Sequence, residues 1–359
     1  MANKRWFQVG VAILLTLVII FLFMKVRSIF VPIVIVAQTI FIPLLIGGVL
    51  FYLTRPLLKW LESKKFPRWA SILSVFIVIG LVGWLFYSLV GPPLAKQVNS
   101  LVKYSPEIVK EVEDFTKYVL TQQDKLPESL QKTMEEASGK IDTIAVTAGT
   151  LLIKFIQNLF QGVFLFVLVP FFLVYMLKDH EKFAPFIAKF FKGDKKTWIR
   201  KTLADIDDTL RSYIQGQLFV SFLVGVMLFI GYYAIGLQYA LLLALLGMMM
   251  NVIPFLGPYI ALVPALIIAL IQEPKLAIYV AIIMLVSQQI ESNLITPNVM
   301  GKSLDIHPLT VITIILAAGN IAGLWGIILG VPTYAVVKSI LKNIYAHREG
   351  IKDAATESV

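Results

Sequence analysis

The chain has 359 residues, of which 58% are hydrophobic and 15% are charged, and its formal net charge is +10. A soluble chain carries about 25% charged residues, so this composition argues against a soluble enzyme. Cysteine is absent, which excludes disulfides, thiolate metal ligands and a cysteine nucleophile. The three histidines are widely separated, so we expect no metal site and no cofactor. The positive charge lies in short loops between apolar tracts, where it indicates membrane topology and no nucleic-acid partner.

Long apolar tracts recur along the whole chain. Each has about the 20 residues that a helix needs to cross roughly 30 Å of hydrocarbon. The tracts lack the strict alternation of barrel strands, so we expect helices, which satisfy their own backbone groups in lipid. The sequence therefore predicts an all-α, polytopic helical membrane protein with about eight membrane segments, one of them broken or re-entrant, and a helical extracytoplasmic insert.

The first three predicted spans cover residues 6–24, 29–53 and 71–90. The first is longer than the apolar core of a signal peptide and ends in Lys25, so we interpret it as a retained span. Between the second and the third lie five basic residues and one acidic residue, which places this loop in the cytoplasm. We expect the third span to stop at the Gly-Pro-Pro sequence at 91–93.

Residues 93–148 differ from the tracts before them, because they are polar and carry both signs of charge. Apolar residues from Val98 to Val119 follow alternating gaps of three and four, which is typical of a packed helical seam. Two interpretations stay open: a helical hairpin that packs on itself, and a contact between protomers. Pro106 argues against one long continuous coiled coil.

The fourth predicted span lies within residues 149–177, and a basic linker follows it at 178–211. The linker has an apolar face that suits a helix lying in the membrane interface. This face consists of Phe183, Phe186, Ile187, Phe190 and Phe191.

The remaining straight spans are predicted at 212–235, 275–295 and 308–337. The tract from 237 to 272 is too long for one straight span and contains three prolines, so we expect it to be broken. The predicted organisation is transmembrane helices 1–3 at 1–92, the insert at 93–148, helix 4 at 149–177, the amphipathic cytoplasmic linker at 178–211, the transport core with helices 5–8 at 212–343, and a tail at 344–359. This count of spans places both termini in the cytoplasm.

The first candidate site is a polar element at the start of the span at 212–235. Asp207 and Asp208 precede Arg211 by four and three residues, which places them on one helical face. Gln215 and Gln217 continue the polarity into the span. We predict a gate ion pair between Arg211 and one of the aspartates, with the two glutamines as a polar entrance. The structural alternative is an interface anchor with an ordinary surface ion pair.

The second candidate site consists of Asn251, Pro254, Gly257 and Pro258, which interrupt an apolar tract. Prolines and a glycine free backbone groups that persist at membrane depth only where protein or a water-filled cavity satisfies them. Transporters use broken helices of this kind to bind substrates and ions. The alternatives are a simple proline kink and a loop that joins two short hairpin helices.

The third candidate site centres on Glu291, the only acidic residue of the span at 275–295. Gln288 precedes it by three residues and shares its helical face, and Asn293 follows. An acid within the bilayer usually faces a cavity, and a carboxyl group near amide oxygens suits proton exchange, cation coordination or a polar solute. We predict that this group and the broken tract line the substrate or ion path. The alternatives are a buried structural hydrogen-bond node and a residue at the membrane interface.

These three motifs, in this order, resemble the autoinducer-2 exporter family of bacterial membrane proteins. The residues that carry the resemblance are the elements at 211–217 and 253–258, the series Gln288, Glu291, Asn293, Pro297, Gly301 and His307-Pro308-Leu309, and the N-terminal Pro43, Pro56 and Arg68. The resemblance covers nearly the whole chain. It implies an eight-segment helical fold in the bacterial cytoplasmic membrane, assembled as a homo-oligomer. Members are linked to export of autoinducer-2, and others to sodium or lithium/proton antiport.

We therefore expect a secondary transporter that exports a small polar solute, with autoinducer-2 as the first candidate and Glu291 as the proton-coupling or solute-contacting group. Its partners would be the lipid bilayer, the solute with a proton or sodium, and further copies of the chain. Two alternatives stay open: a sodium(lithium)/proton antiporter that uses the same carboxyl group, and a non-transporting membrane scaffold built on the polar insert. Because the sequence contains no serine–histidine pair, no paired intramembrane aspartates and no nucleotide-binding loop, we expect no enzymatic activity.

Overall fold

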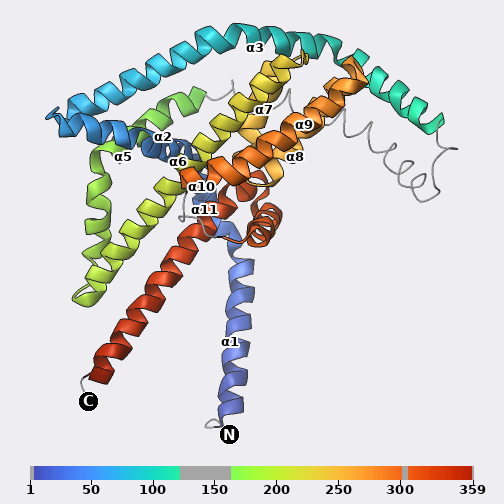
Figure 1. Cartoon of the computed structure of the whole chain (residues 1–359). Coiled ribbons are helices and arrows are strands. Elements are labelled where there is room, and N and C mark those ends of the chain that lie inside the picture. The colour runs from blue at the N-terminus through green and yellow to red at the C-terminus, as the bar shows by residue number, and fades with distance from the viewer. Residues whose placement is uncertain (1–3, 122–162, 301–305, 358–359) are drawn as a thin grey trace. The chain divides into compact units, whose positions relative to one another are not determined.

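The computed structural model describes residues 4–121, 163–300 and 306–357 (Figure 1). Within these ranges the chain is helical and contains no strand. In the described part of the chain, five helical stretches are long and apolar enough, by length and composition, to cross a membrane: Ser28–Ser63, Arg68–Tyr104, Asp194–Ala234, Pro274–Met300 and Pro308–His347, of which the last contains a turn at Ala322 and Gly323. Shorter apolar helices accompany them. The prediction of an all-α, polytopic membrane protein is confirmed.

The helices keep the labels of Figure 1. Their bounds are α1 Arg5–Lys25, a 3-10 helix Arg27–Phe30, α2 Val31–Ser63, α3 Arg68–Thr121, α5 Val163–Ala188, α6 Asp194–Ala234, α7 Ala240–Met250, α8 Leu256–Gln272, α9 Pro274–Ile290, a π-helix Glu291–Ile295, α10 Thr296–Met300 and α11 Pro308–Glu357. Every candidate site residue lies on, or between, the helices from α6 to α10.

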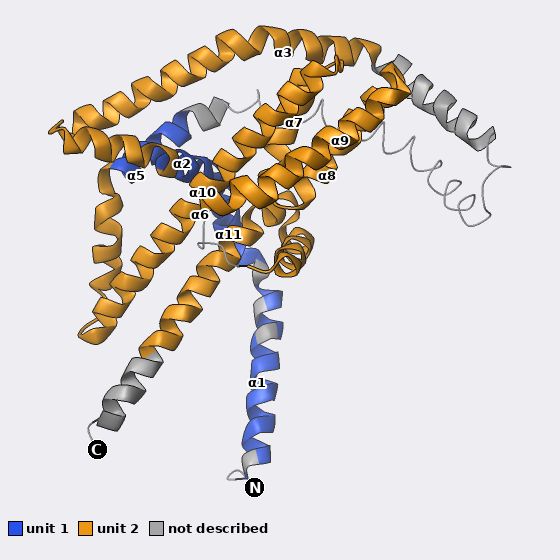
Figure 2. Ribbon diagram, in the orientation of Figure 1, with its two compact units in different colours: residues 1–51, 163–177 blue, residues 52–162, 178–359 orange. Residues whose placement is uncertain are grey.

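The chain divides into two compact units, which Figure 2 colours separately. Unit 1 comprises residues 1–51 and 163–177, and unit 2 comprises residues 52–162 and 178–359. In unit 1, α2 packs closely against α5 at Gly47, where an added Cβ would lie 3.1 Å from the Cβ of Phe172. Apolar side chains along α1 and the start of α2 are largely exposed, which suits helices surrounded by lipid. All candidate site residues belong to unit 2.

Helix α3 does not stop where we predicted. It continues through the Gly-Pro-Pro at 91–93, so only the apolar stretch ends there. Contacts within unit 2 hold the extension: Gln97 Oε1 accepts a 2.9 Å hydrogen bond from the backbone N–H of Leu242, and Leu101 packs against the core. Gln97 thereby satisfies a donor in the first turn of α7 that would otherwise have no helical partner. The remainder of the predicted insert, residues 122–148, lies outside the described residues.

Helix α5 continues beyond the predicted end of the fourth span and carries Phe183 and Phe186, while Phe190 lies in the turn that follows. All three side chains are exposed. The aromatic face is therefore a continuation of α5 and not a separate interfacial helix. Residues 149–162 of the predicted span lie outside the described residues. Helix α6 then runs unbroken through the predicted boundary between 211 and 212.

The tract from 237 to 272 forms a hairpin of two short helices, α7 and α8, which we call the first hairpin. Helix α7 has 11 residues, and its length of about 16 Å is too short to cross the hydrocarbon. The two ends of the tract lie side by side. The Gln272 amide donates to the Gly236 carbonyl at 2.9 Å, and its oxygen accepts from the Gln238 N–H at 2.8 Å. The tract therefore returns to the side from which it came, and the predicted break is confirmed.

Helix α11 also reverses its direction, at Ala322 and Gly323, whose backbone angles are not helical. Residues on the two sides of this turn touch. A Cβ added at Gly326 would lie 1.8 Å from the carbonyl oxygen of Ala318. A Cβ added at Gly330 would lie 3.1 Å from the Cβ of Ala318. In one straight helix Ala318 and Gly326 would be about 12 Å apart along the axis. The predicted straight span at 308–337 is therefore wrong: residues 308–321 and 324–357 are two antiparallel arms, which we call the second hairpin.

Small residues explain why this tract folds back although its length suits a span. Gly323 adopts a φ of +57°, a left-handed conformation that glycine takes without steric cost. Gly326 has no side chain, so the two backbones can make contact there. Ile306, before the first arm, and Lys342, in the second, line one cavity of about 660 Å³, so the start and the end of the hairpin lie close together.

Helix α6 is the centre of unit 2. Every fourth residue from Val220 to Tyr232 is buried and packs into a cluster with α7, α8 and α9. A second cluster joins Tyr213 of α6 to Ile253 in the turn of the first hairpin and to Ile315 in the second. Both hairpins therefore pack against α6 next to the polar element that the sequence indicated.

Candidate functional site

The three predicted motifs meet at the turn of the first hairpin. Gln217 of α6, Asn251 at the end of α7, and Gln288 and Glu291 at the end of α9 form one chain of hydrogen bonds, which we call the Glu291 network. Asn251 and Gln217 are buried, and Glu291 is half-buried. Sequence reasoning named all four residues, and the structure places them together.

Asn251 is the central residue of this network. It ends α7, where backbone carbonyls lack a helical partner. Gln217 Nε2 satisfies the Asn251 carbonyl at 2.7 Å. The Asn251 side chain then donates from Nδ2 to Glu291 Oε1 at 3.3 Å. A backbone group that the broken helix frees is thus paired by protein, and the same residue links α6 to the π-helix.

Glu291 receives its hydrogen bonds from neutral amides. Gln288 Nε2 donates to Glu291 Oε2 at 2.9 Å, so each carboxyl oxygen has one amide donor. Among the residues that the structure describes, no basic side chain forms an ion pair with Glu291. The charge of the carboxylate is therefore not compensated locally. This leaves Glu291 available to a proton, a cation or a hydroxyl-bearing solute.

Pro254, Gly257 and Pro258 build the turn and do not donate to the network. Gly257 is required by close approach, because an added Cβ would lie 1.9 Å from the Met250 carbonyl oxygen. Phe255, between the two helices, has a φ of +63°, an uncommon conformation for a bulky residue. These residues bring the start of α8 against the end of α7 and thereby fix Asn251 in place.

Asn293 does not belong to the network, contrary to our prediction. Its Nδ2 donates to Gln289 Oε1 at 2.8 Å on an exposed face. Asn293 follows Glu291 by only two residues, which turns it to another side of the helix. Glu291 itself begins a five-residue π-helix, a feature found often at functional sites.

Arg211 forms an ion pair with Asp208, whose charged atoms are 3.0 Å apart, and its role as a gate stays a prediction. Asp207 has different partners: Arg55 Nη1 at 2.6 Å and the hydroxyl of Tyr52, which donates at 3.1 Å. Sequence reasoning missed Arg55 and Tyr52 as site residues. The only signal was the position of Arg55 directly after an apolar tract, and nothing in the sequence links it to a residue 152 positions away.

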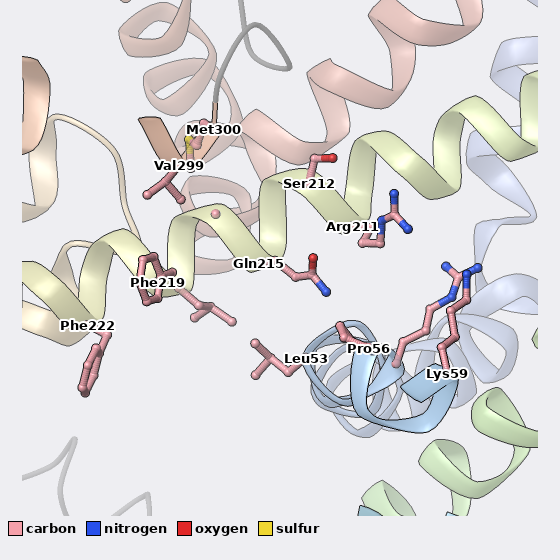
Figure 3. A pocket seen from close by; sticks show the side chains of 13 residues that line it. Leu53, Pro56, Lys59, Arg211, Ser212, Gln215, Phe219, Phe222, Val299 and Met300 are labelled. Carbon is pink, nitrogen blue, oxygen red and sulfur yellow. The ribbon is translucent and has the colours of Figure 1, made fainter. Parts of the chain in front are cut away.

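Gln215 and Gln217 lie on different sides of α6, so they do not form one polar entrance. Gln217 is buried against the first hairpin, whereas Gln215 donates to the Tyr52 carbonyl at 2.6 Å. On the Gln215 side lies a cavity of about 890 Å³ between α2, α6 and α10, which we call the basic cavity (Figure 3). Met300 of α10 packs against Gly216 and closes one wall.

Ionisable groups outside the apolar segments form their own contacts. Arg68, at the start of α3, donates to Glu181 of α5 at 3.0 Å. This hydrogen bond holds the pKa of the Glu181 carboxyl below its usual value. The pair joins polar ends of helices and lies apart from the Glu291 network.

A multi-pass helical membrane protein with helical hairpins around a polar group has the architecture of a membrane transporter. The sequence profile described as "AI-2E family transporter" matches residues 11–346, and the chain belongs to this family. It is 35% identical over 341 residues to "Putative transport protein YueF" of Bacillus subtilis, which covers 92% of this chain and 91% of that protein. "Putative transport protein YrrI" of the same organism is 34% identical, with 94% of each chain covered. "Putative permease PerM" of Escherichia coli is 23% identical, with 83% and 86% covered.

Proposed function

We propose that this membrane transporter exports a small polar solute, with autoinducer-2 as the first candidate, and couples the export to protons through Glu291. In this proposal it is not an enzyme, and it works as a homo-oligomer in the bacterial cytoplasmic membrane with both termini in the cytoplasm. The observation that carries the proposal is the hydrogen bond between Glu291 and Asn251, because it joins a carboxyl group to the turn of a re-entrant hairpin.

Protonation of Glu291 would change how the first hairpin is held. As a carboxylate, Glu291 accepts from Asn251 on one oxygen and from Gln288 on the other. Protonation turns one oxygen into a donor, and that oxygen then opposes an amide N–H. The Asn251 contact, at 3.3 Å, is longer than the Gln288 contact at 2.9 Å, so we expect it to break first. The turn of the hairpin would then be released from the π-helix.

A polar solute can take the place of these internal hydrogen bonds. The network offers amide groups of Gln217, Asn251 and Gln288 together with one carboxyl group, and these suit a compact solute with several hydroxyl groups. The name of the family points to autoinducer-2 as the substrate to test first.

Sodium or lithium is the second candidate, and the absence of a basic partner for Glu291 within the described residues favours it. A cation could bind the carboxylate together with amide or carbonyl oxygens of Asn251 and Gln288, which are hard oxygen ligands. The described residues contain no group of three acidic or histidine side chains that is arranged to hold a metal ion. Such a site would therefore depend on one carboxylate.

The test is flux into liposomes that contain only this protein. We would set a pH gradient and add autoinducer-2, sodium or lithium, comparing the wild type with Glu291→Gln. Glu273→Gln is the matched control, because Glu273 is an exposed acid at the other end of α9.

We expect autoinducer-2 flux with proton movement in the wild type and in the control, and a loss of at least tenfold in Glu291→Gln. Proton flux that responds only to sodium or lithium would instead establish the antiporter. Absence of both fluxes in the wild type would contradict the proposal for these substrates and favour another solute or the scaffold.

A further inference from the structure

The basic cavity lies on the opposite side of α6 from Gln217, and its two ends differ in chemistry (Figure 3). One end is lined by the basic side chains of Arg55, Lys59 and Arg211. The other end is lined by apolar side chains, among them Leu53, Leu218, Phe219 and Phe222. From Arg211 to Phe222 the distance along α6 is about 16 Å. The cavity is therefore long enough to hold a charged group at one end and a hydrocarbon chain at the other.

The lining of the basic end is cationic. The described residues that line it include Arg55, Lys59 and Arg211, whereas Asp207 and Asp208, which pair with Arg55 and Arg211, do not line the cavity. Lys59 is exposed and forms no ion pair with any residue that the structure describes, and a longer-range electrostatic interaction links it to Glu181. A phosphodiester, which carries one negative charge, would suit this cationic lining.

The position of the basic end along the chain corresponds to a membrane–water boundary. Arg211 is the last charged residue of α6 before an uncharged tract that reaches Gln272. Next to Lys59, Trp60 is 58% exposed, and Trp69 is 70% exposed at the start of α3. Exposed tryptophans beside basic residues mark the level of lipid headgroups. The apolar end, with Phe219 and Phe222 exposed, then lies at the depth of acyl chains.

We propose that the basic cavity binds one anionic phospholipid, with its phosphate at Lys59, Arg55 and Arg211 and an acyl chain along the apolar end. Basic pockets between transmembrane helices are known to take anionic headgroups. A soluble phosphate ester would match the charges, but it would leave the apolar end in contact with water. The bound lipid would join the end of α2 to α6 and α10, beside the Arg211–Asp208 pair.

The proposal is tested by native mass spectrometry of the full chain in detergent, titrated with palmitoyl-oleoyl phosphatidylglycerol. Lys59→Gln removes the unpaired cation, and Lys64→Gln is its control, because Lys64 is an exposed lysine that does not line the cavity. Phe222→Ala shortens the apolar end, and Phe229→Ala, two turns further along α6, is its control. Size-exclusion profiles would show that each variant remains folded.

We expect Lys59→Gln to weaken phosphatidylglycerol binding about fivefold. Phe222→Ala should also weaken it, and both controls should bind as the wild type does. Phosphatidylcholine should bind more weakly than phosphatidylglycerol. Three results would overturn the proposal: equal losses in a variant and its control, equal binding of the two lipids, or displacement of the lipid by an equal concentration of glycerol 3-phosphate. The last result would identify the ligand as a soluble phosphate ester.

Discussion

The two hairpins of unit 2 are closed in the same way but held by different interactions. In each, a glycine brings the arms into backbone contact, Gly257 in the first and Gly326 in the second. The turn of the first hairpin contains Asn251, which is hydrogen-bonded to α6 and to the π-helix. Near the turn of the second, the Asn320 amide donates to a carbonyl of its own helix at 2.9 Å.

This difference indicates which hairpin can respond to chemistry at the site. The turn of the first hairpin is bonded to a carboxyl group, so a proton or a solute can change its contacts. The part of the second hairpin nearer its turn meets α6 through apolar residues, including Ile315 and Val331, whose contacts do not depend on protonation. Its polar contact with α6, in which Asn343 Nδ2 donates to Asp205 at 2.9 Å, lies further along the second arm, away from the turn. We therefore expect the first hairpin to move during transport and the second to serve as its frame.

The largest expected effect concerns the side of the membrane on which the two ends of each hairpin lie. The chain contains no cysteine, so single cysteines can be labelled without background. We expect Gln238→Cys and Lys275→Cys to react with an impermeant maleimide from one side of the membrane, and His307→Cys and Lys342→Cys only from the other. A straight α11 would instead expose positions 307 and 342 on opposite sides.

The next largest effect is on folding. An added methyl group at Gly257 or at Gly326 would lie less than 2 Å from a backbone carbonyl oxygen, at 1.9 and 1.8 Å. We expect Gly257→Ala and Gly326→Ala each to lower the free energy of unfolding by about 3 kcal/mol, because the backbone at the contact cannot move aside as a flexible side chain does. Gly80→Ala is the control, since an added Cβ there meets nothing within 4 Å. Thermal unfolding in detergent measures all three, and a stable Gly326→Ala would contradict the reversal of α11.

A smaller effect on stability should distinguish the turn of the first hairpin from that of the second. Gln217→Leu leaves the buried Asn251 carbonyl without its donor. We expect a loss of about 0.6 kcal/mol and at most about 1.7 kcal/mol, the average and the maximum found for hydrogen bonds between membrane helices. Asn320→Leu removes only a bond within its own helix on an exposed face, so its effect should be close to zero. Equal losses in the two variants, measured by thermal unfolding, would remove the distinction between the hairpins.

The smallest expected effect on stability comes from the Arg68–Glu181 pair, which lies outside both hairpins. Because Arg68 lowers the pKa of Glu181 in the folded protein, this pair stabilises the protein above the unfolded value of 4.5. Its contribution decreases as the pH falls through the lower, folded pKa. Glu181 is 64% exposed, so we expect less than about 1 kcal/mol. Unfolding of the wild type and of Glu181→Gln should differ at pH 7 and converge as the pH falls below the folded pKa of Glu181, and a difference that grew with acid would contradict this sign.

The first hairpin could be predicted from the sequence because residues that disrupt helices lie at its break. Pro254, Gly257 and Pro258 interrupt a tract that is too long for one span. The second could not, because Ala322 and Gly323 contain no proline and the tract around them has the length of a tilted span. There the deciding factor is tertiary contact between Gly326 and Ala318, which no local pattern reveals.

The same limit applies to the site. Glu291 and Gln288 could be paired from their spacing, since helical geometry brings residues three apart together. The pairing of Arg55 with Asp207 depends on how α2 meets α6, and Asn293, which follows Glu291 closely in sequence, is hydrogen-bonded to Gln289 outside the Glu291 network. Contacts within one helix could therefore be predicted from spacing, whereas contacts between helices could not.

The π-helix at Glu291–Ile295 has a consequence for insertions and deletions. A π-turn holds about one residue more than an α-turn, so it shifts the helical register of everything after it by about 100°. With this extra residue, Glu291 faces Asn251 while Met300 packs against Gly216. Deleting one residue between 292 and 295 would leave a regular α-helix with all its backbone hydrogen bonds. It would nevertheless rotate Met300 away from α6, so loss of a residue here would damage packing without damaging the helix.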